Sequence, residues 1–216
     1  MTNITVDQFK DAAWTGDIRI VREYIEAGGD VNALASNGVT ALVALDPGVL
    51  EYLFLNGADP GVVWADGNPA ICFHAWEVNV DGLQWFLKKG VDPNLYHRWT
   101  GENCLHSLTA KPNSLDERKE AIELLIRAGA DVNAKTKSGV TTGNFMRDVR
   151  VVGESPLHRA AAYQSHQTIE LLLNSGADKS AKDRRAESAL SWASRHWRSR
   201  KILRLLAYGE YENSIL

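Results

Sequence analysis

Histidine and cysteine are the residues of this chain whose chemistry would be most informative, because both bind metals and serve as bases or nucleophiles. No two histidines have the i, i+4 spacing of a helical zinc pair, and no short spacing joins the two cysteines. The spacing therefore predicts no metal site. The eight residues are His74, His97, His106, His158, His166, His196, Cys72 and Cys104.

Cys72 and His74 stand two residues apart in the sequence. On a helix, two residues at this spacing point to different faces. Cys72 also lacks a basic neighbour in sequence that would lower the pKa of its thiol. We therefore expect no nucleophile–base pair here. A catalytic role for Cys72 and His74 is kept as an alternative, which replacement of both residues would test.

The motifs that bind phosphate or expose a nucleophilic serine are also absent from the sequence. Neither Gly-x-x-x-x-Gly-Lys-Ser/Thr nor Gly-x-Gly-x-x-Gly occurs, and Gly-x-Ser-x-Gly is missing as well. The sequence thus predicts that the protein is not an enzyme and needs no cofactor.

What does recur is the tripeptide Gly-x-Asp, whose aspartates stand 29, 33, 39 and 47 residues apart. A period near 33, widened by insertions, predicts a stack of small structural units rather than one globular core. The five aspartates are Asp30, Asp59, Asp92, Asp131 and Asp178.

Apolar residues at helical spacing precede most of these tripeptides, as in Ile122, Leu125 and Ile126. The glycine that follows each stripe suits a left-handed helix C-cap. A shorter, often alanine-rich helix comes before each stripe, for example at residues 160–162. No such unit could bury its apolar face alone, so stability must come from stacking on neighbours.

Residues 153–161 and 169–178 together closely resemble an ankyrin repeat, and so do residues 12–33. The resemblance covers nearly the whole chain and implies an all-α ankyrin-repeat solenoid of helix-turn-helix units with β-hairpin fingers. His106 and His158 match the Pro-Leu-His slot of the repeat, where the imidazole is expected to satisfy backbone groups of the adjoining turn. Within a single domain, 1–216, the approximate units are 5–33, 34–62, 63–95, 96–134, 135–181 and 182–211.

Several units depart from the regular pattern. In the second unit, Asp46-Pro47 reads as a fresh helix start, which leaves the first helix about two turns long. Capping boxes are expected at Thr5–Gln8 and from Ser114. About 14 extra residues between Gly139 and Gly153 should lengthen the fifth finger, and 208–211 looks like a closing cap.

Solenoids of this kind bind partners along their concave edge, so we predict the binding residues there. Exposed aromatic residues beside arginines are typical of binding hot spots. The alternatives are that finger aromatics pack on the next finger and that the 140–152 insertion is merely mobile; Trp85 is expected in the core. The predicted contacts are Trp14, Trp64, Trp76, Glu77, Tyr96, His97, Arg98, Trp99, Phe145, Met146, Arg147, Arg150, Tyr163, Arg195 and His196.

Charge is distributed unevenly along the chain. Residues 1–100 hold 13 acidic and 6 basic side chains, whereas residues 101–216 hold 14 acidic and 18 basic ones. This gradient could orient a charged partner, or it could belong to solvated faces of a capping unit. Few cysteines, no run of 18 apolar residues and no signal-peptide layout lead us to expect a monomeric cytoplasmic protein without a membrane segment.

The leading hypothesis is an adaptor or inhibitor that binds and masks another protein, with a toxin-neutralising immunity protein as one concrete form. The alternative is nucleic-acid binding through the basic last repeat, with Trp192 and Trp197 as stacking residues. The acidic overall balance, with a net charge of −3, disfavours that alternative.

Overall fold

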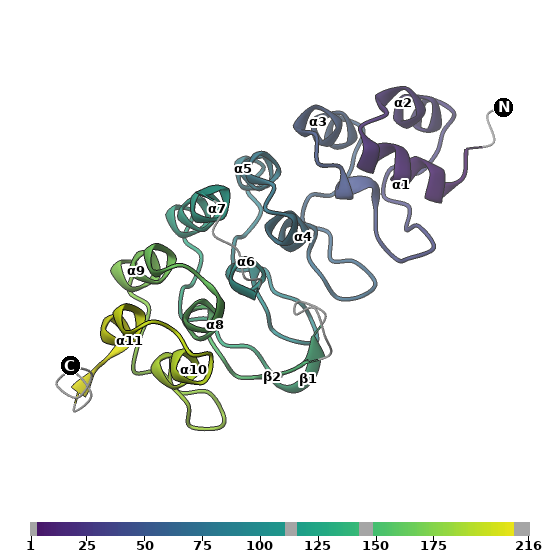
Figure 1. The fold of residues 1–216 in the computed structure, drawn as a ribbon. Helices are drawn as coiled ribbons and strands as arrows, with labels where there is room; N and C mark the ends of the chain where they lie inside the picture. Colours follow the sequence, from purple (N-terminus) through teal and green to yellow (C-terminus); the bar gives the residue numbers. More distant parts are fainter. Residues whose placement is uncertain (1–3, 111–115, 143–148, 210–216) are drawn as a thin grey trace.

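The computed structural model of the chain describes residues 4–110, 116–142 and 149–209. These residues form successive pairs of short antiparallel helices, shown in Figure 1. The pairs are α1 (Val6–Thr15) with α2 (Ile18–Glu26), the 3-10 turn η1 (Ala41–Val43) with α3 (Pro47–Leu55), α4 (Ala70–Glu77) with α5 (Val80–Lys88), α6 (Cys104–Ala110) with α7 (Asp116–Arg127), α8 (Pro156–Tyr163) with α9 (His166–Asn174), and α10 (Ala189–Arg195) with α11 (Arg200–Leu206).

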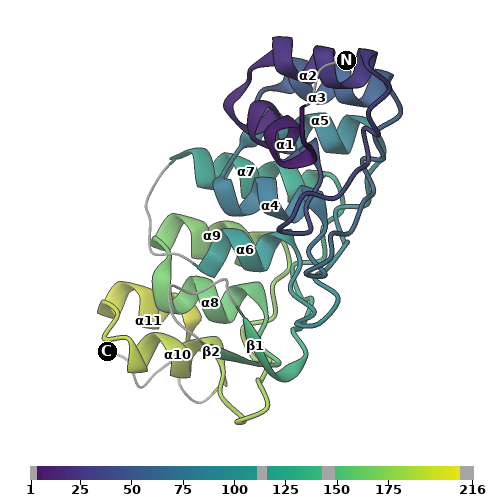
Figure 2. The same ribbon diagram turned by 90° about the vertical axis from the view of Figure 1, so that its right-hand side faces the viewer.

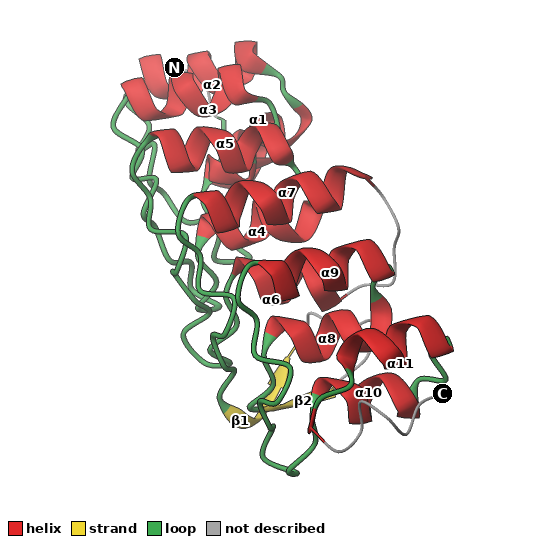
Figure 3. Ribbon diagram, turned by 90° about the vertical axis from the view of Figure 1, so that its left-hand side faces the viewer, coloured by secondary structure: helices red, strands yellow, loops and turns green. Residues whose placement is uncertain are grey.

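The pairs stack side by side, so the first members form an inner row and the second members an outer row, with the termini at opposite ends (Figure 1). The loops that join one pair to the next project together to one side of the helices (Figures 2 and 3). In the fifth finger, β1 (Ser138–Thr142) pairs antiparallel with β2 (Val149–Val152). This confirms the predicted helical solenoid with hairpin fingers.

One continuous apolar core runs between the two rows of helices. Each outer helix contributes one to three fully or nearly fully buried aliphatic residues, as Leu50, Leu83 and Leu125 illustrate. Small residues such as Ala75 and Ala160 are fully buried on the inner helices, where they allow close approach. Trp85 is buried as predicted, with 7% of its surface exposed.

The Gly-x-Asp tripeptide recurs because each copy forms the same turn after an outer helix. The glycine of each turn has a positive φ, between 81° and 93°, where an L-residue with a Cβ would be strained. Each aspartate then accepts a hydrogen bond at Oδ1 from the backbone N–H two residues later, at 2.8–2.9 Å. The glycine ends the helix and the aspartate fixes the turn that leads into the finger.

An asparagine two residues after the aspartate ties one turn to the next. Asn32 donates to the carbonyl of Gly57 at 2.8 Å and accepts from the N–H of Asp59 at 2.9 Å. Asn94 and Asn133 make the same pair of bonds to the turns that follow them. Gly61 stands at this position in the second repeat, so the second and third repeats lack this amide clamp.

The second repeat departs further from the pattern than predicted. Its inner helix is a single 3-10 turn of three residues rather than two helical turns. The reason is that Asp46 already caps the next helix, accepting from the N–H groups of Gly48 and Val49 as expected. The predicted capping box at Thr5 and Gln8 is confirmed. Ser114 and the finger tip with Phe145, Met146 and Arg147 lie outside the described residues.

Candidate functional site

The fingers are joined to each other by a ladder of backbone hydrogen bonds. The N–H of Arg98 donates to the carbonyl of Gly67 at 2.8 Å, and that of Lys137 donates to Thr100 at 2.7 Å. Ala65 and Arg184 make the equivalent bonds to Gly38 and Val152. The fingers therefore form a continuous wall beside the inner helices (Figure 2). We call the surface where this wall meets the inner helices, on which the pocket described below opens, the candidate groove.

Aromatic side chains line the amino-terminal part of this groove. Trp14 at the end of α1 exposes 40% of its surface, and its ring lies 5.6 Å from that of Phe73 on α4. The two residues belong to the first and third repeats. They meet because the second repeat offers only the short turn η1 between them.

The structure does not support the prediction that Trp64 contacts a partner. Only 4% of its surface is exposed, its ring packs 5.4 Å from Phe73, and its indole N–H donates to the Thr40 hydroxyl at 3.2 Å. The side chain is therefore a packing residue that anchors the third finger to the second repeat. Its buried polar atom is satisfied within the protein, as is usual for a buried tryptophan.

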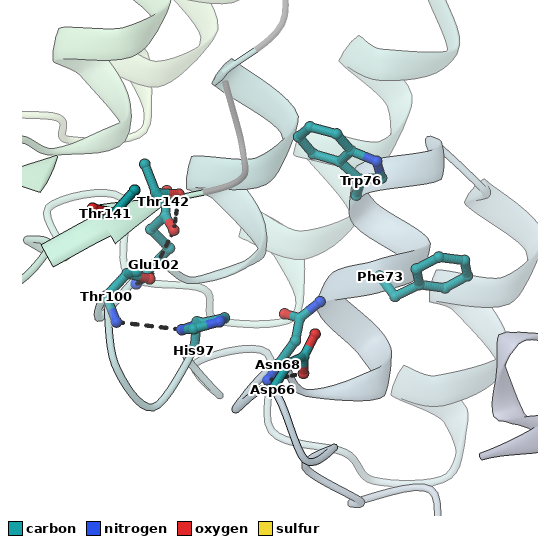
Figure 4. Close-up of a pocket in the computed structure, with 9 residues that line it drawn as sticks. All are labelled: Asp66, Asn68, Phe73, Trp76, His97, Thr100, Glu102, Thr141 and Thr142. Carbon is teal, nitrogen blue, oxygen red and sulfur yellow. Dashed lines mark hydrogen bonds between the residues drawn. The ribbon is translucent and has the colours of Figure 1, made fainter. Parts of the chain in front are cut away.

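A pocket of about 370 Å³ opens in the groove where the third, fourth and fifth repeats meet (Figure 4). Phe73 and Trp76 come from α4, and β1 closes the opposite side. The remaining residues come from the third and fourth fingers. The full lining is Asp66, Asn68, Phe73, Trp76, His97, Thr100, Glu102, Thr141 and Thr142.

His97 presents a hydrogen-bond donor at this pocket. Its Nδ1 accepts from the backbone N–H groups of Trp99 and Thr100, at 3.3 Å each. In the neutral imidazole the other nitrogen, Nε2, then carries the hydrogen. In Figure 4 that nitrogen faces the side of Asn68. Among the described residues, neither His97 Nε2 nor the Asn68 side-chain amide has a hydrogen-bond partner.

Behind the pocket lies a buried group of charges that the sequence did not indicate. The fully buried Arg159 guanidinium lies 2.5 Å from a Glu102 oxygen and 2.6 Å from a Glu154 oxygen. The hydroxyls of Thr100 and Thr142 donate to Glu102 at 2.7 and 2.6 Å. We call Glu102, Glu154 and Arg159 the buried ion cluster.

Glu154 is held in its charged form. Burial alone would raise its pKa, but Arg159 and the N–H of Val152 outweigh burial, so the pKa lies below its usual range. A signal for the cluster exists in the sequence. Glu102 and Glu154 both follow a glycine and precede an x-x-Leu-His stretch, so they occupy the same position in successive repeats.

Three histidines connect repeats through backbone carbonyls. His74 Nε2 lies 2.9 Å from the carbonyl of Leu42, His106 Nε2 lies 3.2 Å from that of Glu154, and His158 Nε2 lies 3.1 Å from that of Glu187. This confirms the backbone role predicted for His106 and His158. Burial lowers the pKa of His74 and of His106 to about 4, so both are neutral at pH 7.

The structure places the two cysteines together, which the sequence did not predict. Cys72 and Cys104 are buried on neighbouring inner helices with their sulfurs 2.7 Å apart. Burial raises the pKa of the Cys72 thiol well above its ordinary value. His74 makes its contacts elsewhere, with Leu42 and Asn79. No group of three metal-binding side chains occurs within the ranges that the structure describes.

The other predicted contacts remain candidates. Tyr96 and Trp99 expose 56% and 53% of their surface, and Arg98 lies 5.8 Å from the Trp99 ring centre. Trp99 also packs on the preceding finger, since a Cβ built on Gly67 would come 2.9 Å from its indole nitrogen. Tyr163 contacts His196, Arg195 pairs with Glu187, and Glu77 and Arg150 are exposed.

Comparison with known families agrees with this architecture. A model described as "Ankyrin repeat" matches residues 100–137, and one described as "Ankyrin repeats (3 copies)" matches residues 138–215. Together the two matches span more than half of the chain. The chain belongs to the ankyrin repeat family. Ankyrin repeats are in general non-enzymatic modules for protein–protein interaction.

Three curated relatives share part of this array. Rabankyrin-5 from Mus musculus is 32% identical over 52% of the chain, and Rabankyrin-5 from Homo sapiens is 36% identical over 37%. L-asparaginase from Dirofilaria immitis is 27% identical over 67% of the chain. The chain covers only 9%, 7% and 25% of the length of these proteins, respectively. Within the described ranges, every helix is too short or too polar to cross a membrane.

Proposed function

We propose that the groove of this ankyrin array binds another protein and masks part of that protein's surface. The observation that carries the proposal is the row of partly exposed aromatic side chains, Trp14, Phe73 and Trp76, along the inner helices. Aromatic residues bury much surface on binding while few rotatable bonds become fixed. Tyr96 and Trp99 supply further exposed aromatic surface on the fingers.

Charge gives the partner an orientation. Arg98, Lys137 and Arg184 occupy equivalent rungs of the finger ladder, whereas the rung nearest the amino terminus is Ala65. The fingers therefore become basic from the fourth repeat onward, while residues 1–100 are acidic on balance. A partner with the complementary charge order would dock in one direction, because opposed potentials favour one register.

Masking by occupation is a function that needs no catalysis. The buried histidines and cysteines are committed to contacts within the fold, which supports a role without chemistry. An inhibitor acting in the cytoplasm, for example a protein that neutralises a toxin, is the form we favour. An adaptor that holds two proteins together would use the same groove without blocking its partner.

The test is photo-crosslinking from the groove. A benzoyl-phenylalanine placed at Trp76 should capture one protein from the native cell extract, and the purified partner should lose activity when the array is added. The matched control is the same residue at Gln84, which is exposed on the outer helix of the same repeat. Equal capture from both positions, or no capture from Trp76, would contradict groove binding.

Nucleic-acid binding keeps one supporting observation. Trp197 exposes 93% of its surface between arginines of the last repeat. Trp192, its expected companion, is instead half-buried against His158, and its indole donates to Asp183 at 3.1 Å. Affinity for single-stranded nucleic acid that falls steeply with salt, and is lost on Trp197→Ala, would favour this alternative.

A further inference from the structure

We infer that the pocket where the third, fourth and fifth repeats meet receives an arginine side chain from the protein partner. The inference rests on the proposed function and specifies the chemistry of the partner residue that enters the groove. Four features of the pocket carry it: its charge, its aromatic wall, its free polar groups and its size.

The charge around the pocket is negative. Asp66 is exposed at the rim, and among the described residues its Oδ1 accepts from the backbone N–H of Asn68 alone, at 2.9 Å. Glu102 forms part of the wall and belongs to the buried ion cluster, where two carboxylates share one guanidinium. The cluster thus sets two carboxyl groups against one guanidinium in a place where water screens poorly. The nearby Arg98 and Lys137 are not among the lining residues.

The aromatic wall favours a flat cation. Trp76 projects from α4 over the pocket, whereas the Phe73 ring, which also lines it, turns the other way, toward Trp14 and Trp64 (Figure 4). A guanidinium is planar and weakly hydrated, so it stacks on an indole or phenyl face while its edge donates hydrogen bonds. With Asp66 on the adjacent finger, an arginine could meet both a ring and a carboxylate.

The polar groups suit the main chain that carries such a residue. The Nε2–H of His97 is a donor without a partner in the described part of the chain, and the Asn68 amide can both donate and accept. In a partner loop that crosses the groove, a backbone carbonyl could accept from His97 Nε2–H. A neighbouring peptide group could bond to the Asn68 amide. An acidic side chain would instead meet net negative charge, and an apolar one would leave Asp66, Asn68 and His97 desolvated without bonds.

The volume is adequate for one side chain with part of its backbone. A pocket of about 370 Å³ lies at the lower end of the range for small-molecule sites, roughly 300–1,000 Å³. It is too small to hold a folded segment, so the occupant is a single protruding residue rather than a helix.

The experiment is an NMR titration of the full chain with a blocked tripeptide, acetyl-Gly-Arg-Gly-amide. We expect saturable shifts of the Trp76 indole N–H and the His97 ring, with a dissociation constant of about 1 mM. The citrulline tripeptide has the same shape without the charge and should bind about tenfold more weakly. Equal binding of both peptides, tighter binding of the glutamate tripeptide, or shifts caused by inorganic phosphate instead would overturn the inference.

Variants separate charge from folding. Asp66→Asn keeps an Oδ1 acceptor for the Asn68 N–H, so the turn survives, yet affinity for the arginine tripeptide should fall about tenfold, or roughly 1.4 kcal/mol. Asp92→Asn is the matched control, because Asp92 makes the same turn bond to Asn94, at 2.8 Å, outside the pocket. Equal loss in both variants, or no loss in either, would refute the role of Asp66.

The inference and the proposed function fail in different ways. If a partner is captured but its binding is unaffected by Asp66→Asn and by excess arginine tripeptide, the groove function stands and the arginine pocket is wrong. If the tripeptide binds as expected but no protein is captured from Trp76, the pocket stands and the proposed function is wrong.

Discussion

The joint between the second and third repeats differs in chemistry from the joint between the fourth and fifth. At the former, Gly61 replaces the clamping asparagine, and the ion pair of the joint lies near the surface. The Trp85 indole donates to Glu51 at 2.7 Å, and Lys89 pairs with the same carboxylate at 2.9 Å. His74 adds its bond to the carbonyl of Leu42.

At the joint of the fourth and fifth repeats, the amide clamp of Asn133 is present and the buried ion cluster lies at the centre. Arg159 also donates to the carbonyl of His106 at 3.2 Å, so three charged groups and a backbone oxygen fix one geometry. Exposed ion pairs stabilise little, whereas removal of one partner from a buried pair is costly. We therefore expect the array to open first between its second and third repeats.

Arg159→Met should have the largest effect on the difference in stability between the two joints. The substitution leaves Glu102 and Glu154 buried next to each other, and the free energy of unfolding should fall by about 3–5 kcal/mol. Lys89→Met is the matched change at the other joint and should cost much less, because Glu51 remains in contact with solvent. Chemical denaturation measures both.

A compensated variant guards against a protein that simply fails to fold. Arg159→Met combined with Glu102→Gln and Glu154→Gln removes all three charges and should recover most of the lost stability. Comparable losses for Arg159→Met and Lys89→Met, or no recovery in the triple variant, would show that the two joints do not differ as described.

Acid should weaken both joints, because each contains a buried neutral histidine. The folded pKa of His74 and of His106 is about 4, below the ordinary value of 6.5, so the unfolded chain takes up protons first as pH falls. The contribution of each neutral histidine to the free energy of unfolding is therefore fully present above pH 6.5. It declines toward pH 4 by about 1.4 kcal/mol per pH unit for each histidine. Burial also lowers the pKa of His158, which acts in the same direction.

Denaturation between pH 7 and 5.5 would measure this slope, and His74→Gln or His106→Gln should each reduce it. Hydrogen exchange sharpens the comparison. In acid, the amides of α1 to α3 should lose protection before those of α6 to α9. A slope of zero, or simultaneous loss of protection along the whole array, would contradict the assignment.

The smallest expected effect is a gain. Gly61→Asn should supply the missing amide clamp to the turn at Gly90 and Asp92, adding about 0.5–1.5 kcal/mol of stability. The site can accept a side chain, since a Cβ there would approach only the Asp59 carboxylate, at 3.3 Å. Gly61→Ala controls for reduced freedom of the unfolded chain. If alanine stabilises as much as asparagine, the clamp does not form.

The fold was largely predictable because its signals are local. A glycine that ends a helix and an aspartate that caps the following turn act within three residues. The turn at Gly28–Asp30 can therefore be predicted from these residues without knowledge of the rest of the chain. The same holds for the cap at Asp46 and for the histidine slots. The second inner helix is shorter than predicted because the segment between its cap at Thr40 and the next cap at Asp46 forms only one 3-10 turn.

The site was less predictable because its properties depend on neighbours in other repeats. Trp64 in sequence resembles the exposed Trp99, yet one is buried against Phe73 and the other stays half-exposed. Arg159 follows His158 in an ordinary helix, and only the arrival of Glu102 from the preceding repeat shows that its charge is buried. Whether a charge is buried depends on how neighbouring repeats pack, and the periodicity of the sequence alone does not predict it.

The contact between Trp14 and Phe73 limits how repeats can be added to or removed from this array. Arrays of this kind grow or shrink by gain or loss of whole units, which requires every unit to present the same face to its neighbours. Here a three-residue turn lets two non-adjacent units touch. Duplicating or excising the second unit would separate or misplace those rings, so we expect the first three repeats to tolerate the gain or loss of a unit less well than the rest of the array.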